Sequence, residues 1–158
     1  MNSFLHYIIA HLFLPLLLIV VVGCAETNTP SNSQAEQDIR SILDKQVVEW
    51  NNGDIPAFMD TYVKSDSLRF SSGGNVQRGY QETLERYQTR YPNRDAMGQL
   101  RFEDLEVQLL SNEWAEVHGR YRQKRGGDYA DAMGLFTLLL QNTSAGWKIL
   151  HDHTSAAD

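Results

Sequence analysis

The apolar residues of this chain repeat with a helical period before Pro92 and with a strand period after it. Ile39, Leu43 and Trp50 recur at the spacing of one helix face. Beyond Pro92, apolar and polar residues alternate from Ala115 onward, which is typical of a half-buried strand. Helices followed by strands predict an α+β domain, with helices packed on one face of a curved antiparallel sheet.

Three helices are expected in the first half of the folded part. The first covers 35–52 and follows a capping box at Ser33. A second, short helix begins after Asp54, because an aspartate can cap it and proline is tolerated in its first turn. The third runs from Gly79 to Pro92, where the proline stops it.

Strands account for the rest of the domain. Segments 68–70 and 76–78 flank a glycine-containing turn and predict a short hairpin. Four longer strands are expected over 100–109, 115–122, 133–141 and 147–154. The first of the four has an irregularity near Asp104. The segment 133–141 is nearly continuously apolar, which predicts burial on both faces.

The amino-terminal segment reads as an export signal. The first 23 residues contain no Lys, Arg, Asp or Glu, and 8–22 is almost unbroken apolar. The segment that ends in Gly23 and Cys24 resembles the lipobox of bacterial lipoproteins, which implies that palmitate or a related acyl chain is attached to Cys24. The alternative is an uncleaved anchor, since about 20 apolar residues can span a bilayer. The expected division is a signal peptide over 1–23, a flexible tether over 24–34 and one domain over 35–158.

Composition excludes several classes of function. With 14 basic and 20 acidic residues, the formal net charge is −6, so the chain lacks the basic footprint that nucleic acid requires. Cys24 is the one cysteine, so neither an intramolecular disulfide nor a thiol nucleophile is expected. Ala25 follows it, which resembles the default for sorting to the outer membrane. We therefore expect an exported protein that is lipid-anchored to the bacterial envelope and faces the periplasm.

Several short motifs resemble the nuclear-transport-factor-2-like superfamily, which includes SnoaL-like cyclases and ketosteroid isomerase. The motifs lie in the order 50–54, 70–74, 78–80, 86–87 and 146–155, and the resemblance extends over 35–157. It implies a cone of curved antiparallel sheet around the helices, with a small-molecule pocket at the open end. It also implies a homodimer formed through the sheet.

The resemblance directs attention to a few candidate catalytic residues. In relatives of ketosteroid isomerase the catalytic base stands where this chain has Phe70 or Ser71, and neither is a base at neutral pH. The isomerase reaction is therefore disfavoured. SnoaL-like cyclases use a carboxylate from the late strands, and the nearest candidate here is Asp152, between His151 and His153.

These three residues alternate along the last strand, so only one set can line the pocket. His151 and His153 share a face with Trp147 and Ile149, whereas Asp152 lies on the opposite face. Inward histidines offer a general base near neutral pH. An inward Asp152 would be a buried carboxylate with a raised pKa. A third interpretation is that the cluster holds the strand end by hydrogen bonds.

No metal or cofactor is expected. His118 could join His151 and His153, but catalytic zinc needs three ligands with an open position and no further ligand has suitable spacing. The chain also has no glycine-rich phosphate loop. Arg120 and Arg122 lie on the polar face of their strand. They are solvated, contact a second subunit, or hold an anion at the pocket mouth.

The aromatic residues suggest a pocket, although periodicity explains most of them as core. Buried phenols need hydrogen-bond partners. The large number of tyrosines therefore hints at a lined cavity. The candidate pocket residues are Trp50, Tyr62, Tyr87, Tyr121 and Phe136.

Three functions remain open at this point. The first is binding of a small apolar molecule in the cone. The second is a lyase, isomerase or cyclase that uses Asp152 or the flanking histidines as acid and base. The third is a protein-interaction module that dimerises through its sheet. A filled cone would favour the third, and an open cone with a buried titratable group would favour the second.

Overall fold

The computed structural model describes residues 32–157. The expected signal peptide over 1–23 and the lipidation site Cys24 lie outside the described residues. Helix α1 (Asn32–Asn52) begins three residues before the predicted start, so the last residues assigned to the tether are helical. Within the described part, no helix is both long enough and apolar enough to cross a bilayer.

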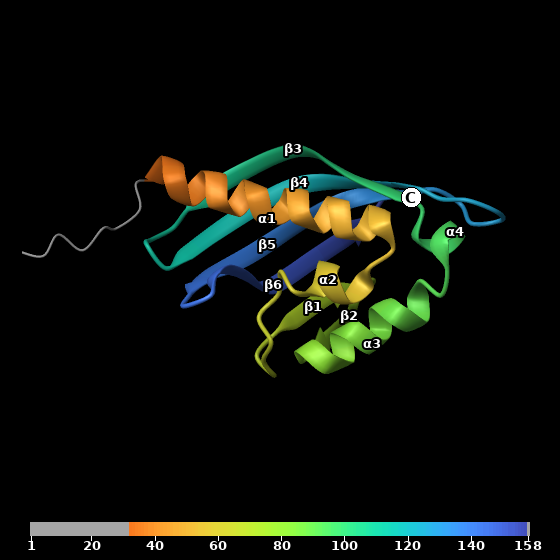
Figure 1. Cartoon of the computed structure of the whole chain (residues 1–158), viewed down its shortest axis with the longest axis horizontal. Coiled ribbons are helices and arrows are strands. Elements are labelled where there is room, and N and C mark those ends of the chain that lie inside the picture. The colour runs from red at the N-terminus through yellow and green to blue at the C-terminus, as the bar shows by residue number, and fades with distance from the viewer. Residues whose placement is uncertain (1–31, 158) are drawn as a thin grey trace, which may run out of the picture.

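The fold is α+β, as predicted, with helices on one face of a curved sheet (Figure 1). After α1 come α2 (Ile55–Met59), α3 (Tyr80–Arg90) and α4 (Arg94–Met97). Helix α1 lies across the face of the longer strands, while α3 lies beside the short hairpin (Figure 1). Helix α4 was not predicted, because a single turn is too short to show a helical period. The Asn93 side chain caps it, accepting a hydrogen bond of 2.9 Å from the Ala96 N–H.

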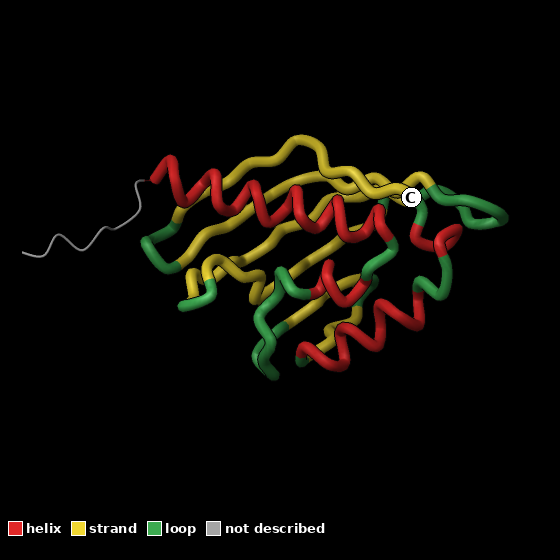
Figure 2. The backbone as a smooth tube through the Cα atoms, viewed as in Figure 1, coloured by secondary structure: helices red, strands yellow, loops and turns green. Residues whose placement is uncertain are grey.

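One six-stranded sheet forms in the order β2-β1-β6-β5-β4-β3. The strands are β1 (Arg69–Ser72), β2 (Asn75–Arg78), β3 (Gln99–Leu109), β4 (Trp114–Lys124), β5 (Ala132–Thr143) and β6 (Gly146–Ala156). Short turns join β3 to β4 and β5 to β6, whereas a longer loop joins β4 to β5 (Figure 2). All neighbours are antiparallel except β1 and β6, which are parallel. The predicted all-antiparallel sheet is corrected at this pair, where the early hairpin adds to the last strand.

The prediction that β5 is buried on both faces is wrong. Met133 and Leu135 are 43% and 53% exposed, and only the alternate residues of β5 are buried. The helices cover one face of the sheet, so apolar residues on the other face stay in contact with solvent. The irregularity expected near Asp104 is confirmed, because the register of β3 on β4 shifts between Glu103 and Glu106 and Asp104 has a φ of 54°.

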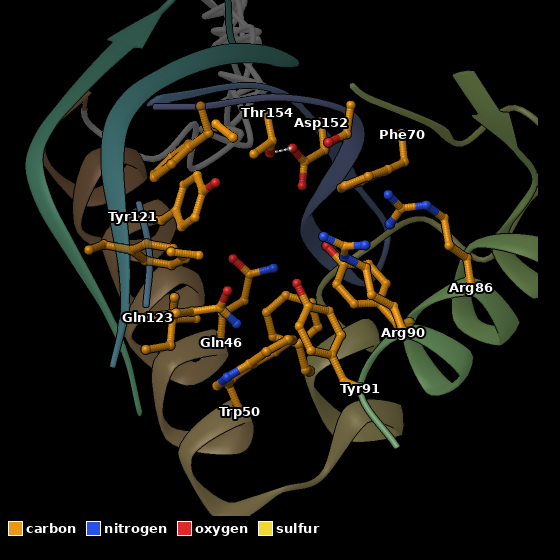
Figure 3. Close-up of a pocket in the computed structure, with 18 of the residues that line it drawn as sticks. Gln46, Trp50, Phe70, Arg86, Arg90, Tyr91, Tyr121, Gln123, Asp152 and Thr154 are labelled. Atoms are coloured by element: carbon orange, nitrogen blue, oxygen red, sulfur yellow. Dashed lines mark hydrogen bonds between the residues drawn. The ribbon is translucent and has the colours of Figure 1, made fainter. Parts of the chain in front are cut away.

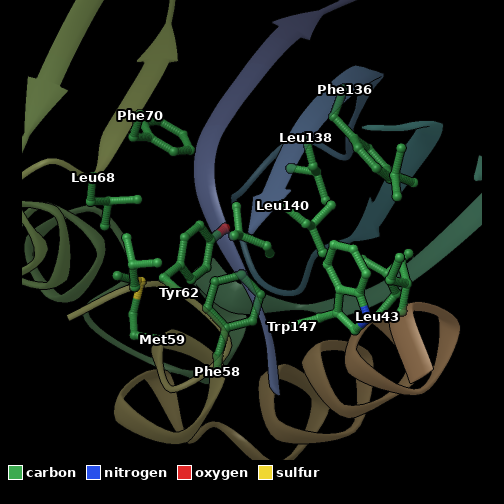
Figure 4. Close-up of a cluster of buried hydrophobic side chains, with 14 of the residues drawn as sticks. Leu43, Phe58, Met59, Tyr62, Leu68, Phe70, Phe136, Leu138, Leu140 and Trp147 are labelled. Carbon is green, nitrogen blue, oxygen red and sulfur yellow. The ribbon is translucent and has the colours of Figure 1, made fainter. Parts of the chain in front are cut away.

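The core fills the space between α1, α2 and the sheet (Figure 4). Leu43 of α1 and Met59 of α2 are fully buried, and they lie in one cluster with Leu140 of β5 and Trp147 of β6. Burial of such side chains contributes about 1.5–3 kcal/mol each.

Hydrogen bonds fix the end of α1 to the start of β3. The Asn51 side chain donates to the Leu100 carbonyl at 3.0 Å and accepts from the Leu100 N–H at 2.7 Å. The Trp50 indole N–H donates to the Met97 carbonyl at 3.0 Å. Arg94 donates to the backbone carbonyls of Trp50 and Asn51 at 2.9 and 2.7 Å, and so caps the helix. The position of Trp50 therefore depends on this junction.

Replacing Asn51 with Ala removes both bonds to Leu100. We expect the free energy of unfolding to fall by about 1–3 kcal/mol, because two partly buried backbone groups lose their partner. Urea denaturation measures this value. The control is Asn52→Ala, an exposed residue of the same helical turn, with an expected change within about 0.5 kcal/mol. Equal effects of the two substitutions would contradict the assignment of the junction to Asn51.

Candidate small-molecule pocket

A cavity of about 200 Å³ lies between the helices and the concave face of the sheet (Figure 3). The lining side chains come from α1, α2 and α3 and from β1, β3, β4, β5 and β6. The cavity therefore exists only in the assembled fold.

All five aromatic residues singled out in the sequence lie in the cavity wall. They are Trp50, Tyr62, Tyr87, Tyr121 and Phe136. Trp50 also packs edge-on against Phe58 and Tyr91, with ring centroids 5.2 and 4.7 Å apart. Gly119 leaves room for Phe136, since a Cβ there would lie 2.5 Å from the Phe136 ring. The same rings thus serve as core and as cavity wall.

A bulge in β6 decides which side chains point inward. Leu140 pairs with Ile149, but Leu139 pairs with His151, so Leu150 is an extra residue in β6. The bulge reverses the alternation, and Ile149 and Asp152 are both buried. The expectation that Trp147 and Ile149 share the histidine face is therefore corrected.

Asp152 is 5% exposed and lines the cavity. Tyr62 donates a hydrogen bond of 2.8 Å to its Oδ2, and Thr154 donates one of 2.9 Å to its Oδ1. Figure 3 shows the Thr154 contact as a dashed line. Burial raises the pKa of Asp152 above its usual range, and the two donors oppose this effect only in part. Asp152 is thus a carboxyl group with an increased tendency to hold a proton.

The neighbouring phenols stay protonated at neutral pH. Burial raises the pKa of Tyr62 well above its ordinary value, and the charge of Asp152 acts in the same direction. Burial likewise raises the pKa of Tyr87. Both phenols are therefore hydrogen-bond donors to whatever occupies the cavity or to Asp152 itself.

His151 and His153 lie on the outer face of the sheet and do not line the cavity. His151 Nε2 is 3.2 Å from the Ser71 hydroxyl, and burial lowers the pKa of this imidazole. His118 Nδ1 lies 3.1 Å from the Thr137 hydroxyl on that face. The bulge thus removes both histidines from the candidate catalytic set. Among residues 32–157, no three His, Cys, Asp or Glu side chains are placed to hold a metal ion.

The structure also bears on two further sequence expectations. Phe70 lines the cavity and Ser71 bonds to His151, so the position of the isomerase base holds no base. Arg120 and Arg122 do not line the cavity, and their Nε atoms lie 3.5 Å from Asp104 and 2.7 Å from Glu103.

The arginines that line the cavity are Arg86, Arg90 and Arg125, which the sequence analysis did not single out. Arg86 and Arg90 directly precede Tyr87 and Tyr91, so the helical period of these tyrosines was the available signal. Arg125 lies in the loop after β4, where no period exists.

Replacing Asp152 with Asn should stabilise the fold at neutral pH. The folded state holds the Asp152 proton more strongly than the unfolded chain, whose aspartate pKa is about 3.9, so stability falls as pH rises from that value to the folded pKa. Asn carries no charge and still accepts from Tyr62. We expect the variant to be more stable at pH 7 by about 1.4 kcal/mol for each pH unit that separates the two pKa values.

Thermal unfolding between pH 3 and pH 8 measures this difference. The difference should disappear near pH 3, where the Asp152 carboxyl is protonated in both the folded and the unfolded chain. The control Asp66→Asn, at an exposed position, should show no such stabilisation at pH 7. A variant that is less stable than the unaltered chain at pH 7 would contradict the raised pKa.

Comparisons with known proteins agree with this architecture. A nuclear-transport-factor-2-like protein of unknown function from Shewanella oneidensis MR-1 is 37% identical, with a TM-score of 0.71 over 76% of this chain and 98% of that one. A ketosteroid isomerase-like protein from Erwinia carotovora atroseptica SCRI1043 is 22% identical, with a TM-score of 0.62 over 77% and 95% of the two chains. A putative aromatic ring hydroxylase from Novosphingobium aromaticivorans is 15% identical, with a TM-score of 0.69 over 82% and 93%.

At identities below 25% the last two likenesses show the fold alone. No curated protein matches the chain. A family model described as a SnoaL-like domain matches residues 39–158. The match covers the cavity and every strand of the sheet. The chain belongs to the SnoaL-like domain family, within the nuclear-transport-factor-2-like superfamily.

Proposed function

We propose that this domain binds a small, mostly apolar molecule in its cone. The observation that carries the proposal is the open cavity of about 200 Å³ with aromatic walls. A packed core rarely leaves voids of this size, and an apolar cavity of about 150 Å³ accepts benzene. Tyr91, Phe102 and Tyr121 line the cavity and are partly exposed, so they supply apolar surface that a ligand would cover. A pure interaction module would have no use for such a space.

A second candidate function is acid–base catalysis in the same cavity. The observation that favours it is Asp152, which is buried in the wall and bonded to Tyr62 at 2.8 Å. A buried carboxyl group with a raised pKa can act as a general acid or, once deprotonated, as a general base. The substrate would be a small apolar molecule, and the reaction a lyase, isomerase or cyclase step.

Filling the cavity tests the binding proposal. The full chain is incubated with a bacterial envelope extract and examined by native mass spectrometry. We expect the unaltered chain to retain a defined small mass and the Leu138→Trp variant to lose it, because Leu138 lines the cavity. Leu135→Trp, on the outer face of the same strand, is the matched control and should retain the mass. Ala132→Trp replaces Leu138→Trp if the latter does not fold.

The outcomes separate the candidates. No retained mass, or equal retention in the filled and unaltered chains, would contradict binding in the cavity. A retained molecule is then returned to fresh protein in heavy water. Deuterium that enters with the unaltered chain but not with Asp152→Asn supports the enzyme, whereas no exchange in either supports a binding protein.

We also propose that Cys24 is acylated and that the domain is anchored to the bacterial envelope, as a homodimer. The apolar run before Cys24 supports the anchor, and exposed Met133 and Leu135 on the outer sheet face support the dimer. Native mass spectrometry of the membrane-extracted chain measures both properties. We expect a two-chain species that begins at Cys24 and carries acyl chains, and Cys24→Ser should lack the acyl mass. A monomer that retains residues 1–23 would contradict both.

A further inference from the structure

Three arginines line the cavity. Arg86 and Arg90 of α3 and Arg125 of the loop after β4 all line the cavity. In Figure 3, Arg86 and Arg90 extend from the same helix toward the cavity, on the side opposite Tyr121. Residues four apart on a helix share a face, so these two guanidinium groups are held as neighbours.

None of these three side chains forms an ion pair with a carboxylate within 4 Å in the described part of the chain, although Asp131 lies near Arg125 and Asp152 near Arg86. The ion pairs of residues 32–157 involve other cations, such as Arg122 with Glu103 at 2.7 Å. Like charges at Arg86 and Arg90 repel each other, and the repulsion destabilises the helix by a few tenths of a kcal/mol. In a chain with a net charge of −6, the fold gathers three arginines without such an ion pair at one cavity, with Arg90 exposed and Arg86 and Arg125 half-buried.

Aromatic rings hold the arginines in place without cancelling their charge. The Arg86 guanidinium lies 4.6 Å from the centre of the Phe70 ring. Arg90 and Arg125 lie 5.9 and 5.7 Å from the centre of the Tyr91 ring. Such contacts orient a guanidinium while its N–H donors remain available.

Arg125 is held at one end and has an unpartnered donor at the other. Its Nη2 donates to the Gln123 side chain at 3.0 Å, but its Nε is buried and has no hydrogen-bond partner within the described residues. A buried donor without a partner is unfavourable by about 1–3 kcal/mol.

The charge balance inside the cavity favours an anion. Asp152 is the one carboxyl group among the lining residues, and its burial favours the neutral form. The Arg86 charge favours the ionised form of Asp152, and the charges of Arg125 and Arg90 favour the ionised form of the Tyr121 phenol. The positive charges therefore affect groups on both walls. An anionic group near the arginines thus meets several positive charges and little negative charge.

The size of the cavity limits the rest of the ligand. A volume of about 200 Å³ exceeds the roughly 150 Å³ that accepts benzene by the space of a short substituent. A guanidinium is planar and matches a carboxylate through two parallel hydrogen bonds. One aromatic ring with a short acidic chain fits both the volume and the charge.

We propose that the ligand is an amphipathic organic anion, a single-ring aromatic carboxylate. Its ring lies against the aromatic wall and its carboxylate is bound by Arg86, Arg90 and Arg125. The proposal rests on the proposed binding function and specifies its ligand class.

A matched pair of probes tests the charge requirement. 3-Phenylpropionate and its neutral isostere 3-phenylpropionamide are titrated into the full chain and followed by ligand-observed NMR. We expect the carboxylate to bind at least ~10-fold more tightly at low ionic strength, with a preference that decreases as salt is added. The double variant Arg86→Gln/Arg90→Gln should abolish the preference. Arg78→Gln, an exposed residue of β2 outside the cavity, should change nothing.

Other results would overturn the proposal, each in a recognisable way. Equal affinity for the two probes, unaltered by the arginine substitutions, would refute the anion and leave the binding pocket intact. Tighter binding of phenyl phosphate than of the carboxylate would refute the carboxylate head group. If neither probe binds while the cavity-dependent mass is retained, the ligand class is wrong and the binding function stands. Arg125→Gln provides the same test if the double variant does not fold.

Discussion

The position of Asp152 depends on one extra residue in the last strand. Without the bulge at Leu150, a strand that buries Trp147 and Ile149 would direct Asp152 to the outer face and the neighbouring histidines into the cone. The bulge keeps the aromatic and aliphatic residues of the narrow end in the core, yet turns the carboxyl group inward at the wide end. The chemistry of the cavity is therefore a consequence of backbone register, and Tyr62 and Thr154 then supply the hydrogen bonds that make the burial tolerable.

The parallel pairing of β1 with β6 completes this arrangement. It places Phe70 beside Asp152 and Ser72 beside Thr154, so the early hairpin forms one wall of the cavity. Phe70 in turn supports the guanidinium of Arg86. Segments from both ends of the domain thus meet at the cavity, and its charge distribution follows from their contact. Three arginines and one buried carboxyl group line the cavity, so its lining carries a net positive charge in an acidic protein.

Most of the elements could be predicted because their residues repeat with a clear period. The three longer helical patterns and the long strands follow from periods of 3.6 and 2. The parallel pair, the turn of α4 and the exposed face of β5 could not, since they depend on which strand lies beside which or on a single capping side chain. The aromatic residues of the cavity wall could be predicted from the sequence. The inward face of β6 could not, because the alternation of apolar and polar residues does not reveal that Leu150 is an extra residue in the strand. The position of Arg125 depends on the geometry of the loop after β4 and could not be predicted either.

The overlap of core and cavity wall links the stability of the fold to occupancy of the cavity. Trp50 is held by the junction of α1 with β3 and packs on Phe58 and Tyr91, and each of these rings also faces the cavity. A molecule that fills the cavity extends the packing of the same rings. Its binding stabilises the folded state, and this stabilisation grows with the logarithm of the ligand concentration once that concentration exceeds the dissociation constant. Asp152 and the unpaired arginines act in the opposite direction in the empty protein, because a buried carboxyl group and repelling guanidinium groups disfavour the fold. A site that is unfavourable when empty and satisfied when filled is what selection for binding produces, since selection for stability alone would have replaced these polar groups with apolar ones.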